Sequence, residues 1–119
     1  VGGDEQLQAD YLRDFMTITF SHPSVDAIVM WGFWAGKHWK PDAALYRRDW
    51  SVKPAGQAWL DLVQKQWWTD HTGQTDAAGS HFLRAFCGRH EIRVAHGGAM
   101  QTIVLDLPKA GKTVKVKLP

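Results

Sequence analysis

AIVMW at residues 27–31 is an unbroken apolar run, and the fold prediction rests on it. A short strand that is apolar at every position is typical of a parallel sheet covered on both faces. Because a helix is expected shortly before this run, the two together form half of a βαβ unit. The sequence therefore predicts an α/β fold in which residues 27–31 form a buried strand.

The helix before this strand is predicted from the spacing of its apolar residues. Leu7, Tyr11, Phe15 and Ile18 recur at the spacing of one helix face, with Leu12 and Met16 beside them. Asp4 is a suitable N-cap for this helix. Pro23 predicts that the helix ends at about Ser21, because the residue before a proline avoids the α conformation.

Residues 32–52 have neither a helical nor a strand period, and they are rich in aromatic side chains. All seven tryptophans of the chain lie between residues 31 and 68. A stretch of about twenty residues without regular structure is usually functional in a compact domain. After it, a second helix is expected to begin near Pro54 and to end at Gly73, with Trp59 and Trp67 on its buried face.

The rest of the sequence has a period of two. Apolar residues alternate with polar ones from residue 82 onward, and turns are expected at Gly88, at Gly97-Gly98 and at residues 108–111. Four short strands with tight connections predict a small antiparallel sheet with one solvated, basic face. The predicted organisation is therefore a first segment at 1–72, a small polar linker at 73–80 and a β-region at 81–119.

Composition excludes several function classes. The 119 residues contain no apolar run near the ~18 residues that cross a bilayer, so no membrane contact is expected. Residues 81–119 hold seven Lys and Arg against two acidic residues, but these charges alternate with apolar residues, so no nucleic-acid partner is expected. The six histidines lack metal-ligand spacing, and Cys87 is alone and expected to be buried. No metal and no cofactor are predicted.

Eight segments in the first eighty residues form a recognisable pattern. They are YLRDF at 11–15, FSHPSVD at 20–26, MWGFW at 30–34, HWKPDAALYRRDWS at 38–51, KP at 53–54, AW at 58–59, QWWTD at 66–70 and GQTD at 73–76. Together they resemble the C-terminal part of glycoside hydrolase family 10, the endo-β-1,4-xylanases. The resemblance is close over roughly residues 5–80 and looser over the β-region.

That family folds as a (β/α)₈ (TIM) barrel. The resemblance implies that this chain supplies barrel helix 7, strand 8 and helix 8, followed by the small four-stranded antiparallel sheet. The barrel is incomplete if the chain is alone, because the neighbours of strand 8 are not among the matched segments. A strand with unpaired edges tends to associate, so a homo-oligomer or a strand-exchanged assembly is expected.

The active site of such a barrel lies at the C-terminal ends of its strands, where the Trp-rich loop falls. The resemblance implies that Trp31 and Trp39 form walls of a sugar-binding cleft. An indole offers a flat apolar surface against which the C–H face of a sugar ring can stack. Trp34 fits the cleft and the core equally well, and His38 is placed to hydrogen-bond a sugar hydroxyl.

The catalytic carboxylates of the family have no counterpart in the matched segments. Retaining glycosidases need two carboxyl groups about 5–5.5 Å apart, and in this family they are glutamates at the ends of strands 4 and 7. Glu5 and Glu91 lie in neither motif and are interpreted as structural, and Ala35 stands where many relatives carry Glu. No catalytic residue is assigned. The remaining alternative is a catalytic carboxylate pair formed by Asp42 and Asp49.

The first hypothesis is that the chain is a fragment of a glycosidase that hydrolyses β-1,4-xylan. Its expected partner is xylan or a xylo-oligosaccharide, and the resemblance implies an extracellular location. Whether the chain alone is an enzyme is left open, because it lacks the acid/base and the nucleophile of the family. Two alternatives remain, a stand-alone carbohydrate-binding module and an interaction fragment that completes the barrel of another chain.

Overall fold

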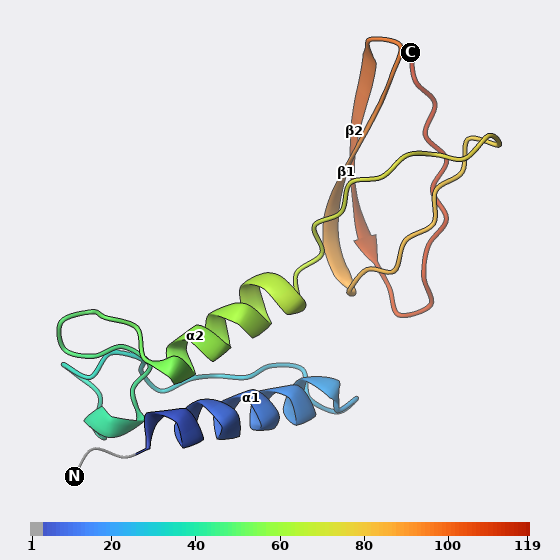
Figure 1. The fold of residues 1–119 in the computed structure, drawn as a ribbon. Helices are drawn as coiled ribbons and strands as arrows, with labels where there is room; N and C mark the ends of the chain where they lie inside the picture. Colours follow the sequence, from blue (N-terminus) through green and yellow to red (C-terminus); the bar gives the residue numbers. More distant parts are fainter. Residues whose placement is uncertain (1–3) are drawn as a thin grey trace. The chain divides into compact units, whose positions relative to one another are not determined.

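The structure, a computed structural model, describes residues 4–119 and divides them into two units after Trp68 (Figure 1). The first unit contains helix α1 (Glu5–Ser21), the short 3₁₀ helix η1 (Pro41–Ala43), helix α2 (Pro54–Asp61) and the π-helical turn η2 (Leu62–Gln66). The second contains strands β1 (Gly88–His96) and β2 (Ala99–Leu107). Residues 69–80, which include the predicted linker, belong to the second unit.

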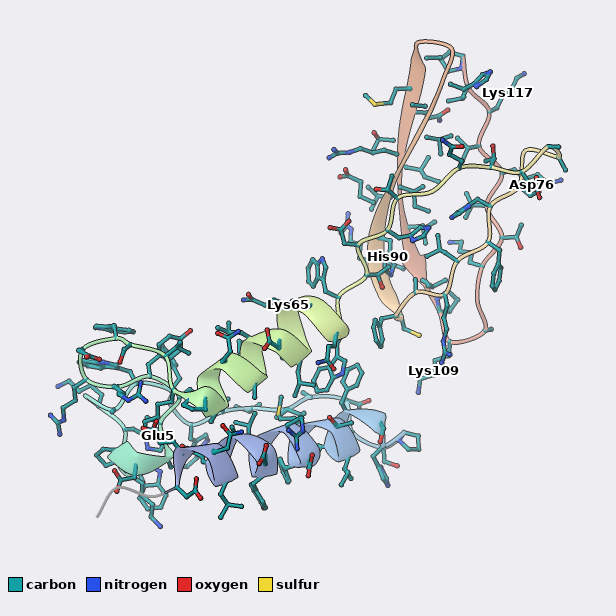
Figure 2. All side chains as sticks on the ribbon, viewed as in Figure 1. Glu5, Lys65, Asp76, His90, Lys109 and Lys117 are labelled. Atoms are coloured by element: carbon teal, nitrogen blue, oxygen red, sulfur yellow. The ribbon has the colours of Figure 1, made fainter. Side chains whose placement is uncertain are left out.

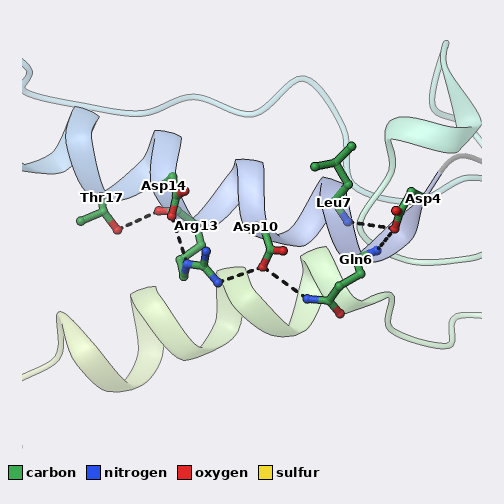
Figure 3. A network of polar contacts seen from close by, with 7 residues as sticks. All are labelled: Asp4, Gln6, Leu7, Asp10, Arg13, Asp14 and Thr17. Atoms are coloured by element: carbon green, nitrogen blue, oxygen red, sulfur yellow. Dashed lines mark hydrogen bonds and ion pairs between the residues drawn. The ribbon is translucent and has the colours of Figure 1, made fainter.

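Helix α1 has the bounds that the sequence predicts. Asp4 is its N-cap, and the Oδ1 atom of Asp4 accepts hydrogen bonds from the backbone N–H groups of Gln6 and Leu7, each at 3.0 Å (Figure 3). The helix ends before His22, which is extended and precedes Pro23. Both boundaries are therefore confirmed, together with the local chemistry that sets them.

One side of α1 carries a chain of polar contacts (Figure 3). Asp10 accepts from Gln6 Nε2 at 3.3 Å and from Arg13 Nη1 at 2.9 Å, and Arg13 Nε also donates to Asp14 at 3.1 Å. These groups are solvent-exposed neighbours on the helix, where ion pairs and hydrogen bonds contribute little to the stability of the protein. The polar side of α1 therefore stabilises the helix only weakly and does not form a site.

The apolar stripe of α1 does not form the core of this unit. Its four residues Leu7, Tyr11, Phe15 and Ile18 are exposed, whereas Ala9 and Met16 on a neighbouring face are buried. Helix α2 packs against that neighbouring face, and the core cluster is Ala9, Leu45 and Ala55, with Leu12 and Trp59 packed against it. The helix prediction is thus confirmed, while the face that it buries within residues 4–119 is a different one.

Helix α2 begins at Pro54, as predicted, with the proline in its first turn. It ends earlier than Gly73, because the chain widens into the π-helical turn η2, in which the N–H of Trp67 donates to the carbonyl of Leu62 five residues earlier, at 2.8 Å. The ring of Trp67 then stacks on Phe20 of α1 with ring centroids 4.0 Å apart. Trp59 and Trp67 therefore both pack against α1 or the core beside it, as the sequence predicts.

Residues 25–31 form no strand within the part of the chain that the structure describes. Val29 is 81% exposed and Trp31 is 87% exposed. A strand exists only where a neighbouring strand pairs with its backbone N–H and C=O groups, and no segment of residues 4–119 does so here. The predicted buried strand is absent from this chain by itself, and the barrel fragment stays a prediction.

The second unit is built on an antiparallel hairpin of two strands, where the sequence predicts four. In its register Ile92 pairs with Ile103, and the burial of both strands alternates with a period of two. The hairpin turn is Gly97-Gly98 with φ values of 57° and 85°, which suits a two-residue turn that needs positive φ. The two inner strands and their turn are confirmed.

The two outer predicted strands are not formed among the described residues: residues 82–87 and 113–118 are assigned to no strand, and the sheet contains β1 and β2 alone. The C-terminal residues 117–119 instead lie beside Met100 and Gln101, with which they line a shallow open groove. Before β1, the N–H of Phe86 donates to Thr69 Oγ1 at 3.0 Å. Cys87 is exposed, so the prediction that it is buried is wrong.

The helices of residues 4–119 are all too short or too polar to cross a bilayer.

Candidate functional site

The Trp-rich stretch at residues 32–52, together with the flanking Trp31 and Lys53, is an ordered loop. Three of its backbone hydrogen bonds join distant positions: Ala35 N to Tyr46 O at 2.9 Å, Tyr46 N to Phe33 O at 2.8 Å and Lys53 N to Leu45 O at 2.9 Å. Tyr46 forms isolated bridges with Trp34 on one side and Val52 on the other. The loop is therefore held by strand-like pairing even though it has no helical or strand period.

Polar side chains fasten this loop to the two helices. Lys53 is only 6% exposed, and its Nζ donates to the carbonyl of Asp42 at 2.9 Å. Gln8 of α1 donates through Nε2 to the carbonyl of Ala43 at 3.0 Å, and Glu5 forms an ion pair with Arg47. Glu5 thus has the structural role that the sequence predicts, because its carboxylate connects α1 to the loop.

The backbone of the loop at Leu45 packs closely against the backbone of α2 at Gly56. A Cβ atom placed on Gly56 would lie 2.6 Å from the carbonyl oxygen of Leu45. Gly56 is buried in α2, so the loop carbonyl occupies the space that any larger residue would need. A glycine at this position is therefore a packing requirement.

Trp34 belongs to an aromatic cluster inside the loop. Its ring stacks on Trp50 with centroids 4.8 Å apart and planes within 9°, and Phe33 and Tyr46 contact the ring of Trp50 obliquely. Its Nε1 donates to the carbonyl of Arg48 at 3.2 Å. Because a Cβ on Gly36 would lie 2.2 Å from the Trp34 ring, that ring also lies directly against Gly36. These contacts favour a supporting role for Trp34.

Trp31 and Trp39 are, by contrast, open to solvent. Trp31 is 87% exposed and Trp39 is 74% exposed, so neither ring is enclosed by described residues. The Nζ atom of Lys40 lies 4.8 Å from the centroid of the Trp39 ring, at cation–π distance. Exposed indoles attached to an ordered loop can stack on a flat apolar ligand surface without first giving up internal contacts.

His38 is held in one orientation by the loop. The ring atom Nδ1 accepts a hydrogen bond from the backbone N–H of Lys40 at 3.0 Å, and the backbone N–H of His38 donates to the carbonyl of Trp34 at 3.0 Å. Gly32, with φ of 110°, lets the imidazole lie close, because a Cβ there would be 3.1 Å from His38 Cδ2. A neutral ring that accepts at Nδ1 carries its proton on Nε2, so His38 can donate to a hydroxyl.

Asp49 of the loop and Glu91 of the second unit both have structural partners. Asp49 Oδ1 accepts from the N–H and the Oγ–H of Ser51 at 3.0 and 2.7 Å, and these hydrogen bonds lower the pKa of Asp49. A general acid at neutral pH needs a raised pKa, so the shift at Asp49 has the wrong sign for that role. Glu91 pairs with Arg93 at 2.6 Å in β1, as its structural interpretation predicts.

Sequence reasoning missed several residues that build this site. Lys53, Arg47 and Gly56 act through partners far along the chain, which no local spacing reveals. The sequence offers one signal for Trp50, because this residue lies in the Trp-rich stretch that is predicted to be functional. Groups of three or more His, Cys, Asp or Glu side chains that could hold a metal ion are absent from residues 4–119.

Comparison with known proteins gives the chain its relatives. No protein-family profile matches it. It is 41% identical over 114 residues, or 94% of the chain, to anti-sigma-I factor RsgI6 of Acetivibrio thermocellus, of which it covers 15%. It is 27% identical over 118 residues to endo-1,4-beta-xylanase 1 of Arabidopsis thaliana and 26% identical over 106 residues to endo-1,4-beta-xylanase 3 of the same plant.

The matched regions cover 97% and 87% of this chain but only 12% and 14% of those two xylanases. The chain thus spans a small part of the length of the curated relatives that it matches. Over most of its own length, it is related in sequence to plant endo-1,4-beta-xylanases.

Proposed function

We propose that this chain forms the sugar-binding end of a xylan-degrading glycosidase of family 10, with Trp31 and Trp39 as stacking surfaces for xylose rings. The observation that carries the proposal is the sequence relationship to xylanases over most of the chain, which includes the loop bearing these two exposed tryptophans. His38 adds a hydrogen-bond donor at Nε2 for a sugar hydroxyl, and Trp34 supports the loop from within.

In this proposal the two catalytic carboxylates come from residues outside this chain. Glu5 and Glu91 are engaged with Arg47 and Arg93, and the pKa of Asp49 is lowered rather than raised. A retaining mechanism needs one carboxylate as nucleophile and one protonated carboxyl group as acid. Glu5, Glu91 and Asp49 therefore fit neither role as well as they fit their structural partners.

The proposed fold is the C-terminal part of a (β/α)₈ barrel, with α1 and α2 as its last two helices and residues 27–31 as its last strand. Two features of the chain support it. The apolar stripe of α1 and the apolar run at 27–31 are both exposed, and both would be covered by neighbouring barrel elements. A large exposed apolar surface in an isolated chain indicates a missing partner.

The binding part of the proposal is tested by affinity electrophoresis of the chain in gels containing soluble xylan. We expect the wild type to be retarded and both Trp31→Ala and Trp39→Ala to migrate faster, with each truncation weakening binding by about 0.5–1.5 kcal/mol. Trp68→Ala is the matched control, because Trp68 is also exposed but lies outside the loop. Identical migration of the wild type in gels with and without xylan would overturn the assignment.

The catalytic part is tested by measuring the reducing sugar that the purified chain releases from xylan. We expect no release, because the required carboxylates are absent. Clear release that is lost on replacing Asp42 or Asp49 with Asn would contradict this part and would identify a carboxylate pair inside the loop.

A second candidate function, an interaction fragment that pairs with another chain, is favoured by one specific observation. The run at 27–31 is apolar and unpaired in backbone hydrogen bonding with any described strand. Unpaired strand-forming segments of this kind are templates for association. Retained xylan binding by a strictly monomeric chain would argue against this function and for the first.

A further inference from the structure

His71 and His81 come together in the second unit although ten positions separate them. Their Nε2 atoms are 3.0 Å apart, and their rings are nearly parallel, with an interplanar angle of 21° and centroids 5.1 Å apart. Both side chains are exposed to solvent. The sequence spacing of the histidines does not predict this pair, because the two residues belong to opposite limbs of a loop.

A tight turn at residues 76–80 brings these two limbs together (Figure 2). Asp76 donates through its N–H to the carbonyl of Ser80 at 2.8 Å, and its Oδ1 accepts from the N–H groups of Ala78 and Ser80 at 2.9 and 2.8 Å. Gly79 has φ of 75°, a conformation that suits glycine. The turn therefore returns the chain so that His81 lies opposite His71.

Gly73 leaves room for both imidazoles. A Cβ atom at this position would lie 2.5 Å from His81 Cε1 and 3.0 Å from His71 Nε2. Real Cβ atoms do not approach ring atoms as closely as 2.5 Å, so a larger residue here would push the two rings apart. The backbone at Gly73 thus forms one wall of the histidine pair.

The backbone also orients His81. Its Nδ1 lies 2.9 Å from the carbonyl oxygen of Gln74, which can only accept a hydrogen bond. Nδ1 of His81 therefore carries the proton, and its Nε2 has a free lone pair when the ring is neutral. Histidines that bind metal ions commonly donate their other ring N–H to a backbone carbonyl in this way.

We propose that His71 and His81 form a two-histidine site for a borderline divalent cation of the Zn²⁺ type. Two imidazole nitrogens at about 2.0–2.1 Å from a tetrahedral Zn²⁺ are about 3.3 Å apart, close to the 3.0 Å found here. In the neutral, metal-free pair, the Nε2–H of His71 donates to Nε2 of His81. When the cation binds between the two Nε2 atoms, His71 carries its proton on Nδ1 instead, so both Nε2 lone pairs face the metal.

The remaining coordination positions belong to water. No third His, Cys, Asp or Glu joins the pair to make a larger ligand group within residues 4–119. Both rings are exposed, so the cation can enter and keep water ligands. Such a site binds imidazole-preferring metals and discriminates against Mg²⁺, which prefers oxygen ligands and near-ideal octahedral geometry.

The test is calorimetric titration of the chain with Zn²⁺, with imidazole ¹⁵N chemical shifts followed in parallel by NMR. We expect one saturable site and shifts confined to Nε2 of His71 and His81. Replacing a direct ligand, in His71→Gln or His81→Gln, should weaken binding by at least the roughly 10–100-fold that follows loss of an outer partner. His96→Gln is the matched control, an exposed histidine on the hairpin of the same unit.

Gly73→Ala gives an independent test, because it keeps both ligands and moves them apart. We expect it to weaken Zn²⁺ binding while the hairpin amide signals stay in place, which separates a lost site from a lost fold. Binding that is equal in the wild type and both histidine variants, or reduced equally by His96→Gln, would overturn the proposal. Competition by Mg²⁺ at concentrations similar to Zn²⁺ would also overturn it.

Discussion

Asp49 and Ser51 hold the turn on which Trp50 is placed. Trp50 lies between them with φ of 68°, in a region that non-glycine residues seldom adopt. The two hydrogen bonds from Ser51 to Asp49 Oδ1 and the bond from Arg47 N–H to Ser51 O, at 2.9 Å, surround this residue. They maintain a strained backbone that positions Trp50 for its stack with Trp34.

The pKa of Asp49 reports on this turn. Its pKa is lowered chiefly by the hydrogen bond from the Ser51 hydroxyl, and then by the backbone N–H of Ser51. Because the folded-state pKa lies below the unfolded one, Asp49 contributes stability above the unfolded pKa and loses it as the pH falls through the folded value. We expect Ser51→Ala to raise the pKa of Asp49 toward its ordinary value, as measured by carboxyl ¹³C NMR.

The conservative variant supplies the control for this prediction. Ser51→Thr keeps a hydroxyl group at the same place and should leave the pKa of Asp49 low. Unfolding measured across the acidic range should show a smaller loss of stability for Ser51→Ala than for the wild type. An unchanged Asp49 pKa in Ser51→Ala would show that another group lowers it.

Whether a feature of the candidate site could be predicted from the sequence depends on how far apart its interacting residues lie along the chain. The Trp-rich loop could be located from the sequence, because it combines aromatic residues with the lack of any period. Lys53 could not be identified as buried, since its partner is a carbonyl eleven residues away, and the fold alone brings them together. The stack of Trp34 on Trp50 depends in the same way on the turn at residues 47–51.

At the scale of elements, Asp4 offers a direct test of what starts α1. Replacing Asp4 with Ala removes the acceptor for the N–H groups of Gln6 and Leu7. We expect a loss of about 0.5–2 kcal/mol in the free energy of unfolding, measured by urea denaturation. Asp4→Asn should keep most of the stability, because its side-chain oxygen still caps the helix. Equal losses in both variants would assign the effect to charge instead of capping.

Elements whose ends are set by nearby residues could be predicted from the sequence. Strands that must pair with a particular distant segment could not. The bounds of α1 follow from Asp4 and Pro23, and the hairpin follows from Gly97-Gly98 between alternating residues. The run at 27–31 has the composition of a buried strand, but a strand forms only beside another strand. The outer strands of the β-region were predicted from the same alternation as β1, yet alternation does not specify which segments pair.

For the whole chain, the exposed apolar surface of the first unit is the dominant feature. Leu7, Tyr11, Phe15 and Ile18 on α1, together with Val29 and Trp31, are exposed side chains of types usually found in cores. The residues that do form the core are mostly small, with four alanines among the seven buried apolar residues of residues 4–119. Large apolar side chains of this unit are thus mostly exposed, while its buried apolar positions are mostly alanine.

We predict that this exposed apolar surface makes the chain self-associate in solution. We expect sedimentation velocity to show species larger than a monomer, whose fraction rises with protein concentration. Val29→Lys should shift the distribution toward monomer, because a lysine on an exposed strand-forming segment opposes edge-to-edge pairing. Val114→Lys is the matched control, since Val114 is a partly exposed valine of the second unit. A chain that remains monomeric at every concentration would contradict the idea that residues 27–31 seek a partner strand.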